Sequence, residues 1–328
     1  MRHLLLMMLT FFLLISCKKE FTNNTSTVNE FSNTAALGPI ISHSVAPNQT
    51  DAAITTINNP LQTAYVQTIA SFRKDLLYVF IPGTGGAPTP FGEILSAAAD
   101  SGYYSFGIAF NGQKPIEELA GDNPDDKTVE NILEEYLTGN DVSPKVNVTK
   151  ANSFENRITK MILYLDSLTP GENWHRFLTN DNRLIWRKVS VAGQSQGSDH
   201  AMYMSKKRPL NRASFFAGPG GFRLNNGDYP TFIRTAAITP IEKIYGFAHK
   251  NDSTRLWKDV KKTWEILGIL GALDNVDKGP LDTTTHKFIT SVDVAIPHVS
   301  LASSVQTPKD ENGNPIFEPI WSLMGFPD

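Results

Sequence analysis

The segment from Val189 to Lys206 constrains the fold of this chain more than any other. Val189 to Ala192 is a short apolar run, Gly193 to Gly197 reads Gly-Gln-Ser-Gln-Gly, and Ser198 to Lys206 has a helical pattern that ends before Pro209. Glycines two residues before and two residues after a serine permit the tight strand-to-helix turn that lifts a serine hydroxyl above a sheet. The segment therefore predicts a buried strand, a helix that follows it directly, and a serine presented between them.

Strand-like and helix-like stretches alternate along most of the chain. This alternation predicts an α/β domain with a mostly parallel central sheet and helices on both faces. We expect one domain over residues 61–328, with a polar excursion from the sheet at 111–152 that carries one short helical piece around Val129 to Leu137. The expected strands are Leu76–Ile81, Tyr104–Phe110, Val189–Ala192, Ala213–Ala217, Ile241–Ala248 and Phe288–Val294.

The first residues resemble the signal peptide of a bacterial lipoprotein. Leu4 to Ile15 is an apolar run too short to span a bilayer, and it leads to Leu14-Ile15-Ser16-Cys17, which resembles a lipobox. Cys17 is the only cysteine, so we expect it to be lipidated after cleavage. The alternative is an ordinary cleaved signal peptide with an incidental cysteine.

The residues after Cys17 are rich in Asn, Thr and Ser and carry few large apolar side chains. Such a composition buries too little apolar surface to offset the entropy of ordering, so residues 18–60 are expected to form a mostly disordered tether. Lys18-Lys19 resembles lipoproteins sorted to an outer membrane. The sequence thus predicts an exported protein that a lipid anchor attaches to a membrane.

The charged residues argue against a nucleic-acid partner. The formal net charge is −3, and no block of Lys and Arg is large enough to follow a phosphate backbone.

A serine nucleophile needs a base and an acid, which in α/β-hydrolases follow the serine in the order Asp or Glu, then His, after later strands. Asp252 follows the expected strand Ile241–Ala248, and His298 follows the expected strand Phe288–Val294. Because the carboxyl ends of parallel strands meet at one edge of a sheet, we expect Ser195, Asp252 and His298 to lie together. The rivals are Asp228 and Asp274 for the acid, and His200, His249 and His286 for the base.

Acyl transfer also needs backbone N–H groups aimed at the oxyanion of its tetrahedral intermediate. One is expected from Gln196, the residue after the serine. The other is expected from Thr84 or Gly85, in the glycine-rich loop Pro82-Gly83-Thr84-Gly85-Gly86 that follows the first expected strand. A phosphate-binding loop is the competing interpretation, but neither a Lys-Ser/Thr pair nor G-x-G-x-x-G spacing is present.

Several of these motifs, taken together, resemble one family. They are Ile81 to Gly86, Ala192 to Gly197 with His200-Ala201, Ile244 to Phe247 with His249 and Asp252, His298-Val299-Ser300, Thr307-Pro308-Lys309, and Pro319-Ile320-Trp321. From Leu76 to its end the chain resembles the BPSS1187-like family of secreted or lipidated α/β-hydrolases, whose substrate is poorly defined. That family usually has His at the position of Gln194 and Gly at that of Val299. The resemblance implies the α/β-hydrolase fold and a triad of Ser195, Asp252 and His298.

The motifs predict a serine hydrolase that acts on a small-molecule or polymeric carboxylic ester through an acyl-enzyme. No metal ion or organic cofactor is expected. Two alternatives stay open at this point. One is a catalytically inactive hydrolase scaffold that binds a glycan or polymer, because a fold alone does not fix function. The other is a peptidase or thioesterase that uses the same triad.

Overall fold

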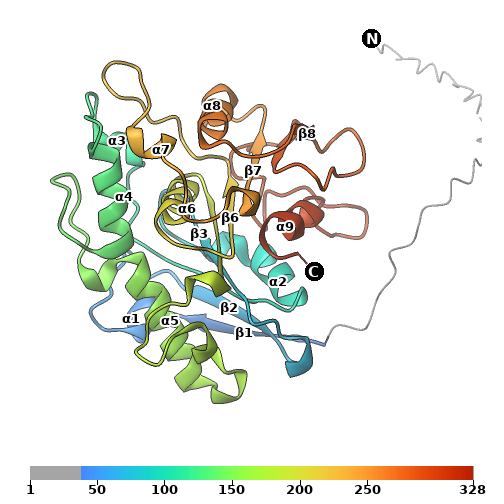
Figure 1. The fold of residues 1–328 in the computed structure, drawn as a ribbon. Helices are drawn as coiled ribbons and strands as arrows, with labels where there is room; N and C mark the ends of the chain where they lie inside the picture. The colour runs from blue at the N-terminus through green and yellow to red at the C-terminus, as the bar shows by residue number, and fades with distance from the viewer. Residues whose placement is uncertain (1–37, 328) are drawn as a thin grey trace, which may run out of the picture. The chain divides into compact units, whose positions relative to one another are not determined.

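Residues 38–327 are the part of the chain that the structure, a computed structural model, describes (Figure 1). The expected signal peptide, Cys17 and residues 18–37 of the expected tether lie outside this range, so the lipid anchor stays a prediction. Among residues 38–327, no helix is both long enough and apolar enough to cross a membrane.

The core of the domain is a nine-stranded, mostly parallel sheet in the order β1-β2-β4-β3-β5-β6-β7-β9-β8. The pairings β1/β2 and β2/β4 are antiparallel, and every other pairing is parallel. This agrees with the predicted α/β class. The strands are β1 (Ile40–Val45), β2 (Gln62–Gln67), β3 (Leu77–Ile81), β4 (Tyr104–Gly107), β5 (Val189–Gln194), β6 (Arg212–Phe216), β7 (Ile244–His249), β8 (Leu273–Asn275) and β9 (Lys287–Thr290).

Helices cover both faces of the sheet, as alternate residues of β3 illustrate. Leu77 and Val79 belong to the core cluster on the side of α4, α5 and α6, whereas Tyr78 and Phe80 belong to the cluster on the side of α2 and α9. All four side chains are fully buried. A continuous apolar run is what a strand covered on both faces requires. The α-helices are α1 (Pro47–Thr50), α2 (Gly92–Asp100), α3 (Ile116–Ala120), α4 (Thr128–Thr138), α5 (Phe154–Leu168), α6 (Gln196–Lys207), α7 (Thr231–Arg234), α8 (Trp257–Leu267) and α9 (Glu318–Gly325).

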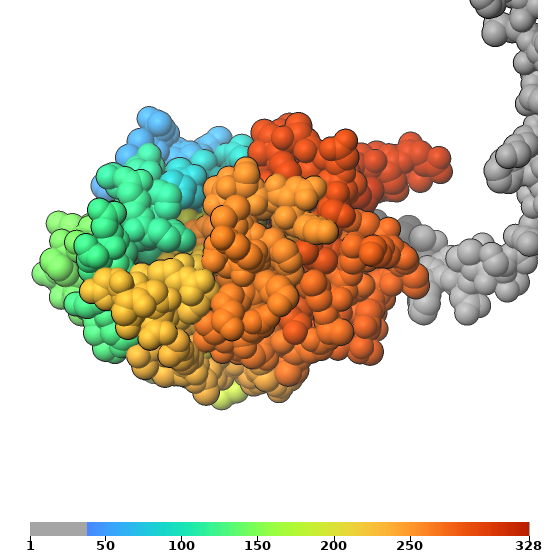
Figure 2. Space-filling view, turned by 90° about the horizontal axis from the view of Figure 1, so that it is seen from above, coloured from blue at the N-terminus to red at the C-terminus, as the bar shows by residue number. Residues whose placement is uncertain are grey.

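The parallel strands end at one edge of the sheet, and the loops that follow them meet there. Figure 2 shows the excursion at 111–152 in green beside the yellow and orange segments that follow β6 and β7. The excursion holds two helices, α3 and α4, of which only α4 was expected. Parallel sheets bring the loops after their strands to a common edge, which is where their ligand sites form.

The expected tether extends too far toward the carboxyl terminus. Residues 38–60 include β1 and α1, and Val45 and Ile54 within them are buried. β1 pairs with β2 along its whole length, and the imidazole of His43 lies 2.9 Å from the carboxylate of Glu172, 129 residues along the chain. The folded domain therefore begins before residue 61, because residues distant in the chain stabilise a strand in which apolar and polar residues are mixed.

Three expected strands differ from the observed ones by three residues or more at one end. β4 ends at Gly107 instead of Phe110, because the N–H of Phe110 donates to the carbonyl of Gly86 at 3.1 Å and not to a neighbouring strand. β7 begins at Ile244, because a single 3-10 turn occupies Ile241–Lys243. β9 ends at Thr290, because the Asp277 carboxylate accepts the N–H of Ser291 at 2.6 Å and takes it out of the strand ladder. All three differences arise from hydrogen bonds that an apolar run in the sequence does not indicate.

Candidate active site

Ser195 occupies a strained turn between β5 and α6. Its backbone has φ 56° and ψ −120°, a region that non-glycine residues rarely adopt. The strain is held in place from both sides, because the Ser195 N–H donates to the Phe216 carbonyl at 2.9 Å and the Ser198 N–H donates to the Ser195 carbonyl at 2.9 Å. The turn projects the Ser195 side chain away from the sheet, as the sequence pattern predicted.

The two flanking glycines permit this turn because the backbone crosses itself there. A Cβ on Gly193 would lie 2.1 Å from the carbonyl oxygen of Gly197. A Cβ on Gly197 would lie 2.0 Å from the carbonyl oxygen of Ile81 in β3. Neither neighbour is a flexible side chain, so a methyl group at either position would push two backbone segments apart.

We expect Gly193→Ala to lower the free energy of unfolding by about 3 kcal/mol or more, since overpacking against backbone cannot relax through a rotamer change. Gly171→Ala is the matched control, because an added Cβ there meets no heavy atom within 4 Å. The control should change stability by no more than about 1 kcal/mol. Denaturation in urea measures both variants, and equal stabilities would show that the glycine contact is not tight.

The structure brings Ser195, His298 and Asp252 into one hydrogen-bonded chain. Ser195 Oγ lies 2.8 Å from His298 Nε2, and His298 Nδ1 lies 2.7 Å from Asp252 Oδ2. With the imidazole proton on Nδ1, His298 donates to Asp252 and its Nε2 accepts the Ser195 hydroxyl proton. The predicted contacts among these three residues are therefore present, from loops that follow β5, β7 and β9.

Asp252 is held as a carboxylate. Its Oδ1 accepts the backbone N–H groups of Thr254 at 2.8 Å and Arg255 at 2.9 Å, and the residue is only 4% exposed. Burial opposes ionisation, but the hydrogen bond and charge of His298, together with those N–H groups, outweigh it, so the pKa of Asp252 lies below its ordinary value. A carboxylate fixed in this way orients the imidazole and stabilises its protonated form.

The rival acids lie elsewhere. Asp228 is exposed in a turn, where its nearest cation is Arg234 at 3.6 Å. Asp274 belongs to β8 and accepts the N–H of Asp282. Among the contacts of residues 38–327, neither carboxylate reaches a histidine.

The rival histidines have structural partners. His249 Nε2 lies 2.9 Å from the Val292 carbonyl, and His286 stacks on Tyr245 with ring centroids 4.0 Å apart. His200 is buried among aromatic rings, and this burial lowers its pKa to about 3. A buried imidazole such as that of His200 is a packing residue, and of the four histidines His298 is the one that contacts Ser195.

The backbone N–H groups of Gln196 and Thr84, the expected oxyanion donors, have no hydrogen-bond acceptor within residues 38–327. The N–H of Gln196 is at the first position of α6, where a helix provides no acceptor. Thr84 lines the same cavity as Ser195, and its side chain donates to the Gln196 side-chain oxygen at 3.0 Å. The N–H of Gly85 already donates to the Gly112 carbonyl at 2.7 Å. Of the two donors that the sequence left open, Gly85 is therefore the less suited, and Thr84 stays the expected one.

Two features of the site went unrecognised in the sequence. The Gln194 side chain donates to the carbonyl of His298 at 2.9 Å, which fixes the histidine loop against β5. Gln194 stood out only as a departure from the pattern of the family that the chain resembles.

Arg255 forms a buried ion pair with Asp199 of α6 at 2.8 Å, and this pair ties the Asp252 loop to the helix that follows Ser195. Nothing in the sequence around Arg255 and Asp199 indicates that pairing, because 56 residues separate them.

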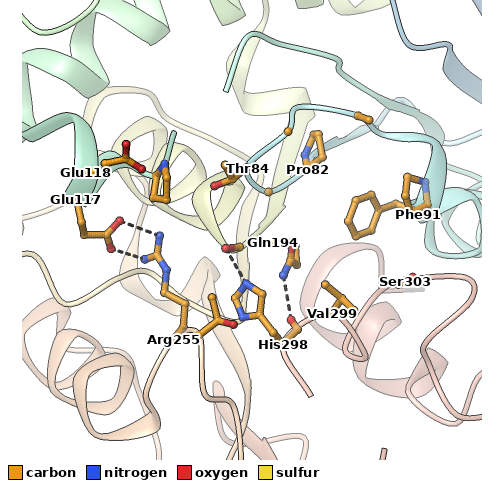
Figure 3. A pocket seen from close by; sticks show the side chains of 17 residues that line it. Pro82, Thr84, Phe91, Glu117, Glu118, Gln194, Arg255, His298, Val299 and Ser303 are labelled. Carbon is orange, nitrogen blue, oxygen red and sulfur yellow. Dashed lines mark hydrogen bonds and ion pairs between the residues drawn. The ribbon is translucent and has the colours of Figure 1, made fainter. Parts of the chain in front are cut away.

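A cavity of about 860 Å³ opens over the hydroxyl of Ser195. Figure 3 shows His298 near its centre, Glu117 and Arg255 on one side, and Phe91 and Val299 on the other. The volume is in the range of small-molecule sites. Within residues 38–327, no group of three or more His, Cys, Asp or Glu side chains is arranged to hold a metal ion. No protein-family model matches this chain, and a search of curated proteins finds no match either.

Proposed function

We propose that this chain is a serine hydrolase of carboxylic esters with an α/β-hydrolase fold, and that it belongs to the family it resembles. The observation that carries the proposal is the unbroken chain from Ser195 Oγ through His298 to Asp252, with contacts of 2.8 and 2.7 Å at the floor of an open cavity. A serine that is buried only for structural reasons needs neither a base nor an acid behind that base.

The arrangement supports a two-step acyl transfer. His298 Nε2 takes the proton of Ser195 as Oγ attacks the ester carbonyl carbon, and the N–H groups of Gln196 and Thr84 receive the oxyanion. The intermediate collapses, the alcohol leaves with the proton from His298, and the acyl group stays on Oγ. Water then attacks the acyl-enzyme by the same route, which releases the acid and restores Ser195.

The topology supports the fold assignment within the proposal. The three residues occur in the order Ser, Asp, His, and they follow β5, β7 and β9 of one parallel sheet. The strained backbone of Ser195 adds to this support, because the strand-to-helix turn around the nucleophile demands it. Export and a lipid anchor at Cys17 belong to the proposal on the sequence pattern alone.

A fluorophosphonate probe tests the proposal without knowledge of the substrate. Such a probe forms an O–P bond with an activated serine, releases fluoride and leaves the hydroxyl proton on the base. We expect peptide mass spectrometry to find one adduct, on Ser195. Ser198 is an internal control three residues along the chain, because it is fully buried and its hydroxyl donates to the Ser195 carbonyl at 2.5 Å.

Unlabelled protein, or an adduct on other serines only, would contradict the proposal. Pre-incubation with a short-chain ester should slow the labelling of Ser195, since the ester and the probe compete for the same hydroxyl.

A further inference from the structure

The cavity over Ser195 has two arms of opposite chemical character. In Figure 3, Glu117, Glu118 and Arg255 lie on one side of His298, and Phe91 and Val299 lie on the other. We call the first side the acidic arm and the second the apolar arm. A substrate whose scissile bond lies over Ser195 places one half in each arm. The chemical character of the two arms therefore determines which esters the cavity can bind.

The two terminal nitrogens of Arg255 in the acidic arm contact two carboxylates. Its Nη1 lies 3.0 Å from Asp199 Oδ1 and 3.0 Å from Glu117 Oε1, and its Nη2 lies 2.8 Å from Asp199 Oδ2 and 3.3 Å from Glu117 Oε2. Three of these contacts are hydrogen bonds, and the one between Nη1 and Glu117 Oε1 is an ion-pair contact. Both terminal nitrogens are therefore already engaged by carboxylates and are not free to form a forked pair with an anionic group of a substrate.

The charge of this cluster is negative. Burial raises the pKa of Asp199, but the carboxylate is stabilised by Arg255, which contacts both of its oxygens at 3.0 and 2.8 Å, and by the N–H of Gly220 at 2.9 Å. Two carboxylates on one guanidinium leave a net charge of about −1. Glu118 adds a third carboxylate, whose charge Lys114 balances at 2.7 Å.

The surface that the acidic arm offers to a substrate is carboxylate oxygen. The Glu117 side chain is 39% exposed, whereas that of Arg255 is 8% exposed. Each carboxylate oxygen keeps lone pairs beyond the one directed at Arg255, so Glu117 can accept further hydrogen bonds. The arm thus accepts hydrogen bonds and repels negative charge.

The apolar arm is shaped by Phe91 and Val299 beside Pro90. Phe91 is 5% exposed and packs against Phe80 of β3, with ring centroids 4.5 Å apart. Ser303 is a polar residue on the same side of the cavity. An apolar group placed against Phe91 and Val299 is removed from water, which is favourable.

We propose that the substrate is an ester with a compact apolar half and a polar half that carries hydrogen-bond donors, hydroxyl or ammonium, without negative charge, and that Glu117 selects this polar half. The inference rests on the proposed hydrolase function, because it uses Ser195 as the point where the two halves meet. Glu117 acts as a specificity residue and takes no part in the proton transfers.

Four butanoyl esters test the inference. Butanoylcholine carries an ammonium group, monobutanoylglycerol carries hydroxyls, O-butanoylglycolate carries a carboxylate, and 4-nitrophenyl butanoate reports on the triad with a neutral, activated leaving group. We expect Glu117→Gln to raise kcat/KM for the glycolate ester relative to the choline or the glycerol ester by about fivefold or more, since it removes one partly exposed charge. Comparing ratios between the wild type and the variant cancels the intrinsic reactivity of each alcohol.

The choline and glycerol esters distinguish the two kinds of donor. If Glu117→Gln lowers kcat/KM for butanoylcholine alone, Glu117 recognises an ammonium group. If it lowers kcat/KM for monobutanoylglycerol as well, Glu117 recognises hydrogen-bond donors in general. Glu118→Gln is the matched control, because it removes an equal charge from the adjacent residue, which Lys114 already balances. It should shift the ratios less than Glu117→Gln does.

Unchanged ratios in Glu117→Gln, with 4-nitrophenyl butanoate still hydrolysed, would overturn the inference and leave the hydrolase proposal standing. The inference is also overturned if Glu118→Gln shifts the ratios as much as Glu117→Gln does. The effect would then come from the loss of any negative charge near the cavity and not from a contact with Glu117. If the wild type hydrolyses none of the four esters and fluorophosphonate does not label Ser195, the hydrolase proposal fails and the inference fails with it.

Discussion

Ser195→Ala should reduce the hydrolysis of a short activated ester by about 10⁴-fold or more, because removal of a serine nucleophile that works with a base costs several orders of magnitude in kcat. The fold should persist. The change removes one hydroxyl and its hydrogen bond to His298, a loss of about 1 kcal/mol in the free energy of unfolding. The measurement is kcat/KM for 4-nitrophenyl acetate, with the melting temperature recorded on the same preparation.

Ser198→Ala is the control for loss of a nearby hydroxyl. Ser198 lies one turn further along α6 and is fully buried, and no contact joins it to His298 among residues 38–327. Its replacement should leave ester turnover within about tenfold of the wild type, because it removes only a hydrogen bond to the Ser195 carbonyl. If Ser195→Ala keeps turnover within tenfold of the wild type, Ser195 is not the nucleophile.

Asp252→Asn should lower turnover by about a thousandfold or more. The amide keeps the shape of the carboxylate and can still accept the N–H groups of Thr254 and Arg255. Its NH₂ group, however, faces His298 Nδ1 across the present 2.7 Å contact and favours the imidazole tautomer with the proton on Nε2. That tautomer cannot accept the proton of Ser195. The measurement is kcat for the activated ester at a fixed pH near neutrality.

Asp228→Asn is the matched control, because it makes the same chemical change at the rival acid. Asp228 is exposed and reaches only Arg234, at 3.6 Å, among its charged neighbours in the described part of the chain. The turnover of the Asp228→Asn variant should stay within about threefold of the wild type, because a solvated surface carboxylate contributes little. A larger loss in Asp228→Asn than in Asp252→Asn would move the acid elsewhere and leave the nucleophile assignment intact.

The triad could be predicted from the sequence, whereas the acidic arm could not. Ser195, Asp252 and His298 each follow a strand with a recognisable apolar run, so strand order alone predicted their meeting. Glu117 and Arg255 follow no such rule, since 138 residues separate them and the short helix α3 that carries Glu117 was not expected. Their pairing depends on how the excursion folds over the cavity.

The loop Pro82 to Gly86 is a second case in which the local sequence does not specify a contact with a distant residue. Its glycines indicate a close approach of backbone to a ligand, but they do not say which N–H stays free. The Gly112 carbonyl decides that question by accepting the N–H of Gly85. Gly112 lies in the excursion that follows β4, and nothing in the loop itself specifies the contact.

The sequence by itself determined the elements whose constraints are local. Gly193 and Gly197 are needed because a Cβ at either position would meet backbone within the turn or in the adjacent strand, and the runs in β3 and β5 are apolar because helices cover both faces of the sheet. Only the tertiary structure decided the inclusion of β1, the pairing of the Gly85 N–H with the Gly112 carbonyl, and the carboxylate pair on Arg255. Each of these depends on hydrogen bonds or ion pairs between residues far apart in the chain, and a polar side chain carries no local sign of the partner it will find.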